Sequence, residues 1–201
     1  MSSVINKQLY IVFGFIGWML LSSSLSAQEQ AIPTFPELLT EAGLELKVPE
    51  GFEEIKLQKN PLLQHEKAMR SQDGSLELRY VIRPLGRIEI DYEDPHSAMP
   101  EPNHMFNMLF HTMIGNLTKR GSRSPTKEYS KAQAKEFFNA DWAAVSVFDV
   151  VPEYSDKYSQ VMMLALHKND LADAYTVFLF DDYAQVKQAV QQSMSSLKFA
   201  N

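Results

Sequence analysis

Two neighbouring stretches near the end of the chain are apolar on both faces of a strand, and they constrain the fold more than any other feature. Residues 161–166 read Val-Met-Met-Leu-Ala-Leu, and residues 175–180 alternate Tyr, Val and Leu with Thr, Phe and Phe. A strand with one apolar face can expose the other to water, whereas a strand that is apolar on both must be covered twice. We therefore predict two central strands, residues 160–167 and 174–180, in a sheet that is covered on both faces.

The rest of the chain predicts more strands than helices, with short turns between consecutive strands. Asp73-Gly74 is a hairpin signal between strands at 65–71 and 76–82. Further strands are predicted at 44–48, 52–57, 88–92 and 141–151, and helices at 34–40, 103–119, 127–139 and 183–196. This order indicates an α+β fold, a three-layer α/β/α sandwich with a central, mainly antiparallel sheet.

The start of the chain has the pattern of a secretory signal peptide. Lys7 precedes an apolar run at 9–21, and small residues follow. A membrane-spanning helix needs about 20 apolar residues, and this run is shorter. We predict cleavage after Ala27, which removes residues 1–27. Residues 28–201 then form a single domain with its core at about 44–199.

The amino-acid composition limits where the protein can be located and which classes of partner it can bind. The sequence contains no cysteine, so it has neither disulfides, nor the acylation site of a lipoprotein, nor a thiolate for catalysis or metal binding. Its 19 Lys and Arg stand against 25 Asp and Glu, which argues against nucleic-acid binding. The sequence contains no basic amphipathic helix of the kind that binds a membrane surface. We therefore expect neither peripheral membrane binding nor membrane insertion after the signal is removed. We expect a periplasmic or secreted protein whose oligomeric state stays open.

Three short segments mark turns and strand ends in a recognisable order. They are Val48-Pro49-Glu50-Gly51-Phe52, Ala174-Tyr175-Thr176-Val177 and Ser196-Leu197-Lys198-Phe199. This pattern resembles the PsbP-like superfamily, which includes an extrinsic subunit of the oxygen-evolving complex, a Ran-binding transport factor and bacterial envelope proteins. The resemblance implies an antiparallel sheet between helices, and a protein that binds or helps to assemble a partner. It transfers no functional residue to this sequence.

The sequence carries no catalytic signature. His65-Glu66 begins like the zinc-protease motif HExxH, but Met69 stands where the second histidine ligand is required. Neither a GxSxG elbow nor a phosphate-binding glycine loop is present. His167 ends a predicted buried strand, and we interpret it as a strand-end residue. We therefore expect a non-enzymatic binding or assembly protein of the bacterial envelope, without a cofactor, whose partner is an unknown protein or ligand.

The alternative is a periplasmic protein that binds a soft metal. His104, Met108 and His111 share one stripe of the predicted helix, opposite its apolar face. Imidazole and thioether groups suit copper. Seven helical residues rise about 10 Å, so His104 and His111 are not expected to share one ion, and His96 or Met99 would complete the site. A solvated helix surface with scattered His and Met explains the same residues.

Two further sets of residues have both a functional and a plain interpretation. Residues 89–94 carry several carboxylates that a hydrolase or a calcium site can use. A charged strand edge that prevents aggregation explains them equally. Trp142, Tyr154 and Tyr158 lie near strand ends and can line a cleft, although such aromatics are common in cores and at rims.

Overall fold

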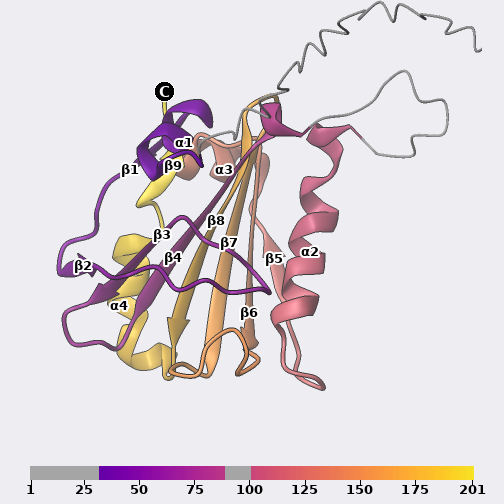
Figure 1. Cartoon of the computed structure of the whole chain (residues 1–201). Helices are drawn as coiled ribbons and strands as arrows, with labels where there is room; N and C mark the ends of the chain where they lie inside the picture. Colours follow the sequence, from indigo (N-terminus) through magenta and orange to yellow (C-terminus); the bar gives the residue numbers. More distant parts are fainter. Residues whose placement is uncertain (1–31, 89–100) are drawn as a thin grey trace, which may run out of the picture. The chain divides into compact units, whose positions relative to one another are not determined.

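A seven-stranded sheet forms the centre of the structure, a computed structural model that describes residues 32–88 and 101–201. Its order is β2-β3-β4-β8-β7-β6-β5, and every neighbouring pair is antiparallel (Figure 1). The strands are β2 (Phe52–Glu54), β3 (Lys67–Ser71), β4 (Glu77–Pro84), β5 (Thr126–Glu128), β6 (Trp142–Asp149), β7 (Gln160–Lys168) and β8 (Ala172–Phe180).

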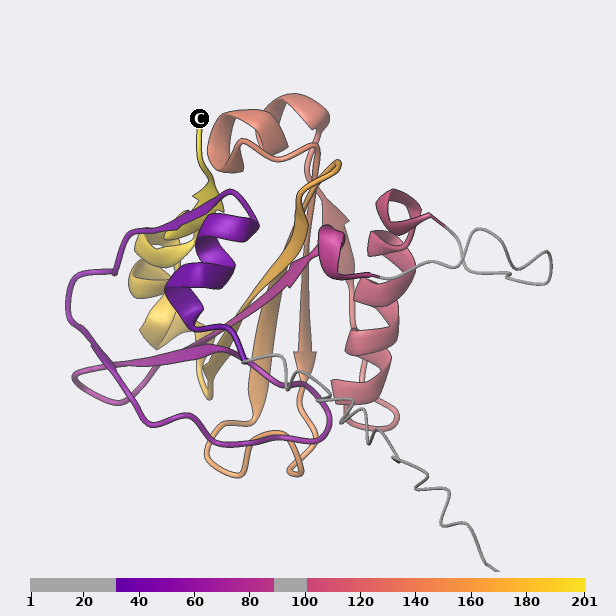
Figure 2. The same ribbon diagram turned by 45° about the horizontal axis from the view of Figure 1, so that its top comes forward.

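Helices cover both faces of this sheet. The described helices are α1 (Phe35–Glu41), α2 (Phe106–Leu117), α3 (Lys131–Phe138) and α4 (Tyr183–Ser193), with short 3-10 turns η1 (Leu85–Arg87) and η2 (Pro102–His104). One face packs against α2, and the other against α1, α3, α4 and a two-stranded ribbon (Figures 1 and 2). The ribbon pairs β1 (Leu44–Leu46) with β9 (Leu197–Phe199). The predicted three-layer α+β sandwich is confirmed.

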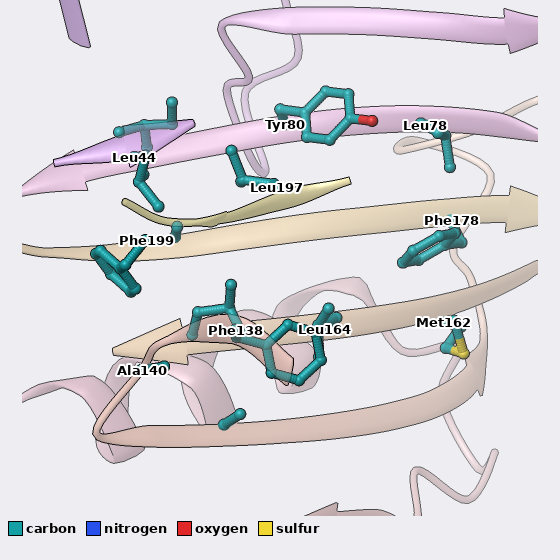
Figure 3. Packing of buried hydrophobic residues seen from close by; sticks show 14 of the residues in the cluster. Leu44, Leu78, Tyr80, Phe138, Ala140, Met162, Leu164, Phe178, Leu197 and Phe199 are labelled. Carbon is teal, nitrogen blue, oxygen red and sulfur yellow. The ribbon is translucent and has the colours of Figure 1, made fainter. Parts of the chain in front are cut away.

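The two strands predicted to be central are central. Every residue of β8 is buried, and β7 is buried except at its two ends. On the face away from α2, side chains from three neighbouring strands meet the ribbon and α3 in one cluster (Figure 3). That cluster includes Leu78, Tyr80, Met162, Leu164, Phe178, Phe138, Leu197 and Phe199. Each large side chain of this kind stabilises the fold by about 1.5–3 kcal/mol when fully buried.

The opposite face carries a second cluster beneath α2. Phe110, Ile114 and Leu117 of the helix are buried against β6, β7 and β8. They recur at steps of four and three residues, which is the spacing of one face of an α-helix. Toward β3 and β4 this face is covered by loops instead, and Tyr154 and Tyr158 from the loop between β6 and β7 join the same cluster.

Local signals set several element ends. Ser130 accepts a hydrogen bond from Gln133 N (3.3 Å), and the Gln133 side chain accepts one from Ser130 N (3.1 Å), which is a capping box at the start of α3. Asn139 ends that helix with a left-handed backbone, φ 52°. In the hairpin between β3 and β4, Gly74 supplies the φ of 71° that the turn requires, as the Asp-Gly signal predicted.

Two predicted helices begin later than their periodicity suggested. Residues 126–128 form the edge strand β5 instead of helix, and α3 starts only after the cap at Ser130. The helix predicted at 103–119 is divided into η2 and α2. There Asn103 donates to Asp170 Oδ1 (2.7 Å) and accepts from Asp170 N (2.8 Å), which binds η2 to the turn between β7 and β8. The predicted signal peptide lies outside the described residues. So does the strand predicted at 88–92, except for Ile88.

Candidate functional site

A polar pocket of about 320 Å³ opens over β3 and β4, on the same face of the sheet as α2. Four segments that are distant in sequence form its walls: the loop after β2, the start and middle of β3 with His65 before it, β4, and the loop between β6 and β7. Asn60 Nδ2 donates to the carbonyl oxygens of Glu153 (3.0 Å) and Tyr154 (3.3 Å), which ties the two loops together. We call this the basic pocket.

A buried carboxylate between two arginines forms the floor of the basic pocket. Glu77 Oε2 accepts hydrogen bonds from Arg70 Nε (3.2 Å) and Nη2 (2.8 Å), and Glu77 Oε1 accepts one from Arg79 Nε (2.8 Å). The side chains of Glu77 and Arg79 are only 4% and 8% exposed, whereas that of Arg70 is 36% exposed. Hydrogen bonding to Glu77 raises the pKa of Arg70 further above its usual value. Arg70 is therefore the member of the trio that solvent, or a ligand, can reach.

Strand register explains why these three charges meet. Arg70 lies directly opposite Glu77 in the antiparallel β3–β4 pair, and Arg79 lies two residues further along β4 on the same face. Opposite charges at such cross-strand positions attract each other. The intervening Leu78 points to the other face, into the main core. Glu77 and Arg79 therefore lie on the face of β4 opposite the main core, and both are buried there.

Arg79 has two further partners in the loop between β6 and β7. Its Nη1 donates to the Tyr154 carbonyl oxygen (3.1 Å), and its guanidinium lies 4.8 Å from the centre of the Tyr154 ring. A planar guanidinium suits such stacking better than a lysine ammonium does. These contacts hold Arg79 in one position, so its charge is preorganised.

His65 contributes an uncharged polar group to the pocket. Burial and the neighbouring Arg79 charge lower the pKa of His65 from its usual 6.5 to about 4. Its Nδ1 is buried and has no hydrogen-bond partner among residues 32–88 and 101–201, and the same holds for the Tyr154 hydroxyl. Buried polar atoms are normally paired.

Charge in the basic pocket opposes that of the whole chain. Four cationic side chains line it, against two carboxylates, in a protein whose net charge is −6. The cations are Lys56, Arg70, Arg79 and Lys157, and the carboxylates are Glu77 and Asp156. Both oxygens of Glu77 already accept bonds from arginines. The arrangement therefore suits an anion that accepts several charge-assisted hydrogen bonds.

The residues of the predicted copper stripe lie on two consecutive elements. His104 ends η2, while Met108 and His111 lie on exposed positions of α2. The described parts of the chain hold no group of three His, Asp or Glu side chains arranged to bind a metal ion. His96 and Met99, either of which would complete the site, lie outside the described residues. Copper binding stays a prediction.

The remaining sequence candidates have different outcomes. The acidic residues at 89–94 lie outside the described part of the chain. Tyr154 and Tyr158 are buried core residues, and Trp142 is half-buried at the edge of a different pocket. His167 lies one residue before the end of β7 and is buried, and its Nδ1 is 2.7 Å from Asp173 Oδ1 on β8.

Sequence reasoning missed the basic pocket. Its one local signal is a pair of opposite charges, Glu77 and Arg79, on a strand whose other face is strongly apolar. That pattern is typical of a solvated strand face as well. The burial that distinguishes the two comes from loops far away in the sequence.

Within the described residues, no helix combines the length and the apolar character needed to cross a membrane. The chain matches no protein-family model and no curated protein. Among solved structures, it is similar to the solution structure of cyanobacterial PsbP (CyanoP) from Synechocystis sp. PCC 6803. The sequence identity is 12% and the TM-score 0.46, over 80% of this chain and 89% of that chain. No residue or activity of that protein is carried over to this chain.

Proposed function

We propose that this chain is a non-catalytic binding protein of the bacterial envelope, and that its basic pocket holds a small organic anion with a carboxylate or phosphate group. The observation that supports this proposal best is the preorganised charge at the pocket floor. Arg79 is held by Glu77 and Tyr154, and Arg70 is held by Glu77 while remaining partly accessible. Location in the envelope rests on the signal-peptide pattern of the sequence.

The chemistry of the pocket favours binding over catalysis. Glu77 is the buried carboxylate of the site, and two arginines occupy its oxygens, which disfavours a role as general base. Ser155 Oγ accepts a hydrogen bond from Tyr158 N (3.0 Å) and has no histidine partner among the described residues. A nucleophile needs an adjacent base to become reactive.

An anion in the pocket would replace water around fixed cations. Arginine forks bind carboxylate and phosphate oxygens in two parallel hydrogen bonds, and lysines at the rim add long-range attraction. The neutral His65 ring offers either a donor or an acceptor without adding charge. The pocket volume of about 320 Å³ suits a metabolite-sized ligand and is too small for a folded domain.

Calorimetry with a panel of anions tests the proposal. The panel comprises acetate, succinate, citrate and inorganic phosphate, each titrated into the purified protein at low salt. We expect at least one Kd below about 1 mM. Arg70→Gln and Lys157→Gln should each weaken that binding about tenfold, because each removes a charge-assisted hydrogen bond.

Lys198→Gln is the matched control. Lys198 is a partly exposed cation on β9 that pairs with Glu45, and β9 packs on the face of the sheet away from α2. Its replacement should change the Kd less than twofold. The proposal fails if no anion of the panel binds up to about 10 mM, or if Lys198→Gln weakens binding as much as Arg70→Gln.

The protein either acts through this ligand alone or presents it to a second protein, and a pull-down from an envelope extract separates the two cases. Enrichment of one protein by the wild type, lost in Arg70→Gln, would show that the ligand site takes part in assembly. Equal recovery by both forms would place the protein contact elsewhere on the chain.

A further inference from the structure

A second pocket, of about 470 Å³, lies at the other end of the strands. Aromatic rings form its wall: Phe106 at the start of α2, Trp142 at the start of β6, and the imidazole of His167 near the end of β7. The Phe106 ring stacks on His167 with 4.1 Å between centres, and its centre is 4.8 Å from that of Trp142. We call this the aromatic pocket.

Register separates the aromatic pocket from the basic pocket. Arg79 pairs with Val177 on β8, whereas His167 pairs with Asp173, four residues earlier on the same strand. Four residues of strand span about 13 Å. The two pockets share no lining residue.

Two lysines face the aromatic wall from α3. Lys131 and Lys135 are separated by one helical turn, lie on the same side of the helix, and both line the pocket. The carboxylate in the lining, Asp141, accepts a hydrogen bond from Asn169 N (2.9 Å) and is engaged with the turn between β7 and β8. The open side of the pocket therefore presents net positive charge beside flat apolar surface.

A buried histidine–aspartate pair lies at the base of the pocket. His167 Nδ1 lies 2.7 Å from Asp173 Oδ1, His167 Nε2 lies 3.1 Å from Asn169 Oδ1, and the His167 and Asp173 side chains are each 2% exposed. Both ring nitrogens of His167 are therefore paired within the protein. These bonds fix the orientation of the imidazole on which Phe106 stacks.

We propose that the aromatic pocket binds a planar aromatic acid. The ring packs against Phe106 and Trp142, and the acidic group lies toward Lys131 and Lys135. Stacking on aromatic side chains favours binding of a flat ring, and the lysines favour binding of a negative charge. The pocket therefore selects molecules that have both. This binding is independent of the anion proposed for the basic pocket.

Tryptophan fluorescence reports on this pocket directly. The sequence has two tryptophans, Trp18 and Trp142. In a full chain with Trp18→Phe, Trp142 is the only tryptophan whether or not residues 1–27 are removed. Titration with benzoate should change its emission in a saturable way, with a Kd of about 0.1–1 mM, and calorimetry should return the same value.

Two analogues and two sets of variants make the test specific. Cyclohexanecarboxylate has the charge without the flat ring, and benzamide has the ring without the charge, so each should bind at least about fivefold more weakly than benzoate. The double variant Lys131→Gln, Lys135→Gln should weaken benzoate binding about three- to tenfold. Lys187→Gln, an exposed lysine on α4, and Arg70→Gln in the basic pocket should leave it unchanged.

Three results would overturn the proposal. The first is no saturable emission change and no heat with benzoate up to about 10 mM. The second is equal affinity for cyclohexanecarboxylate, which would exclude a role for the aromatic wall. The third is an unchanged benzoate Kd in the double lysine variant when its circular dichroism spectrum matches the wild type.

Discussion

Replacing His65 with glutamine should remove an acid sensitivity that the folded protein derives from one buried imidazole. In the folded state, burial and Arg79 lower the pKa of His65 to about 4, against 6.5 for a free histidine. As the pH falls below 6.5, His65 therefore becomes protonated in the unfolded chain but stays neutral in the folded chain. The free energy of unfolding therefore decreases as the pH is lowered from 6.5 to 4. Above pH 6.5, His65 does not destabilise the folded state.

The size of this effect follows from the two pKa values. At pH 5, a change in pKa from 6.5 to about 4 lowers the free energy of unfolding by about 2 kcal/mol relative to pH 8. The ring borders a pocket that water can enter, which screens part of the Arg79 charge. We therefore expect His65 to account for about 1–2 kcal/mol, or a few degrees in Tm.

Urea unfolding at pH 8, 7, 6 and 5 measures the effect in wild type and His65→Gln. The free energy of unfolding of the variant minus that of the wild type should rise by about 1–2 kcal/mol when the pH is lowered from 8 to 5. Contributions from other groups, such as Glu37 and Asp73, whose pKa values are lowered by hydrogen bonds, cancel in this difference.

His111→Gln serves as the control because His111 is exposed on α2. Its difference from wild type should not change with pH by more than about 0.3–0.5 kcal/mol. If the difference in the free energy of unfolding between His65→Gln and the wild type is also independent of pH, burial does not keep the imidazole neutral. The description of the basic pocket is then wrong.

Three further predictions concern stability and metal binding. Glu77→Ala leaves its buried arginine partner without a carboxylate and should lower the free energy of unfolding by about 3–5 kcal/mol, whereas Glu45→Ala, which breaks an exposed pair, should cost less than about 1 kcal/mol in the same urea assay. Phe110→Ala removes a fully buried ring beneath α2 and should cost about 3–5 kcal/mol, while Met108→Ala, on the exposed side of the same helix, should cost less than about 0.5 kcal/mol. The copper hypothesis requires calorimetric binding of Cu(I) or Cu(II) with a Kd below about 10 µM that Met108→Ala and His111→Ala both weaken, and weaker binding in the wild type ends it.

The central part of the fold could be predicted because its signals are local. A strand that is apolar on both faces has to be covered twice, and this pattern alone identifies β7 and β8 as the central strands. The Asp-Gly turn at Gly74 and the periodicity of α2 are also properties of a few consecutive residues. The edge strand β5 escaped prediction because all three of its residues are exposed, so no burial pattern marks it.

Neither pocket could be located in the same way, because each depends on contacts between distant segments. The aromatic pocket forms where η2 is bound to the turn between β7 and β8, which places Phe106 against His167. The sequence identified Trp142 as a residue that can line a cleft. It did not show that Phe106 and His167 lie beside Trp142. A cavity is defined by what stands opposite a side chain, and periodicity does not contain that information.

The alternation of side chains along a strand by itself places Glu77 and Arg79 on the face of β4 opposite Leu78 and Tyr80. Only the tertiary structure decided that this charged face is buried, because the loop after β2 and the loop between β6 and β7 close over it through Asn60. Burial changes the chemistry of the same residues: a surface ion pair contributes little, whereas a desolvated one fixes its arginines in place and keeps His65 neutral.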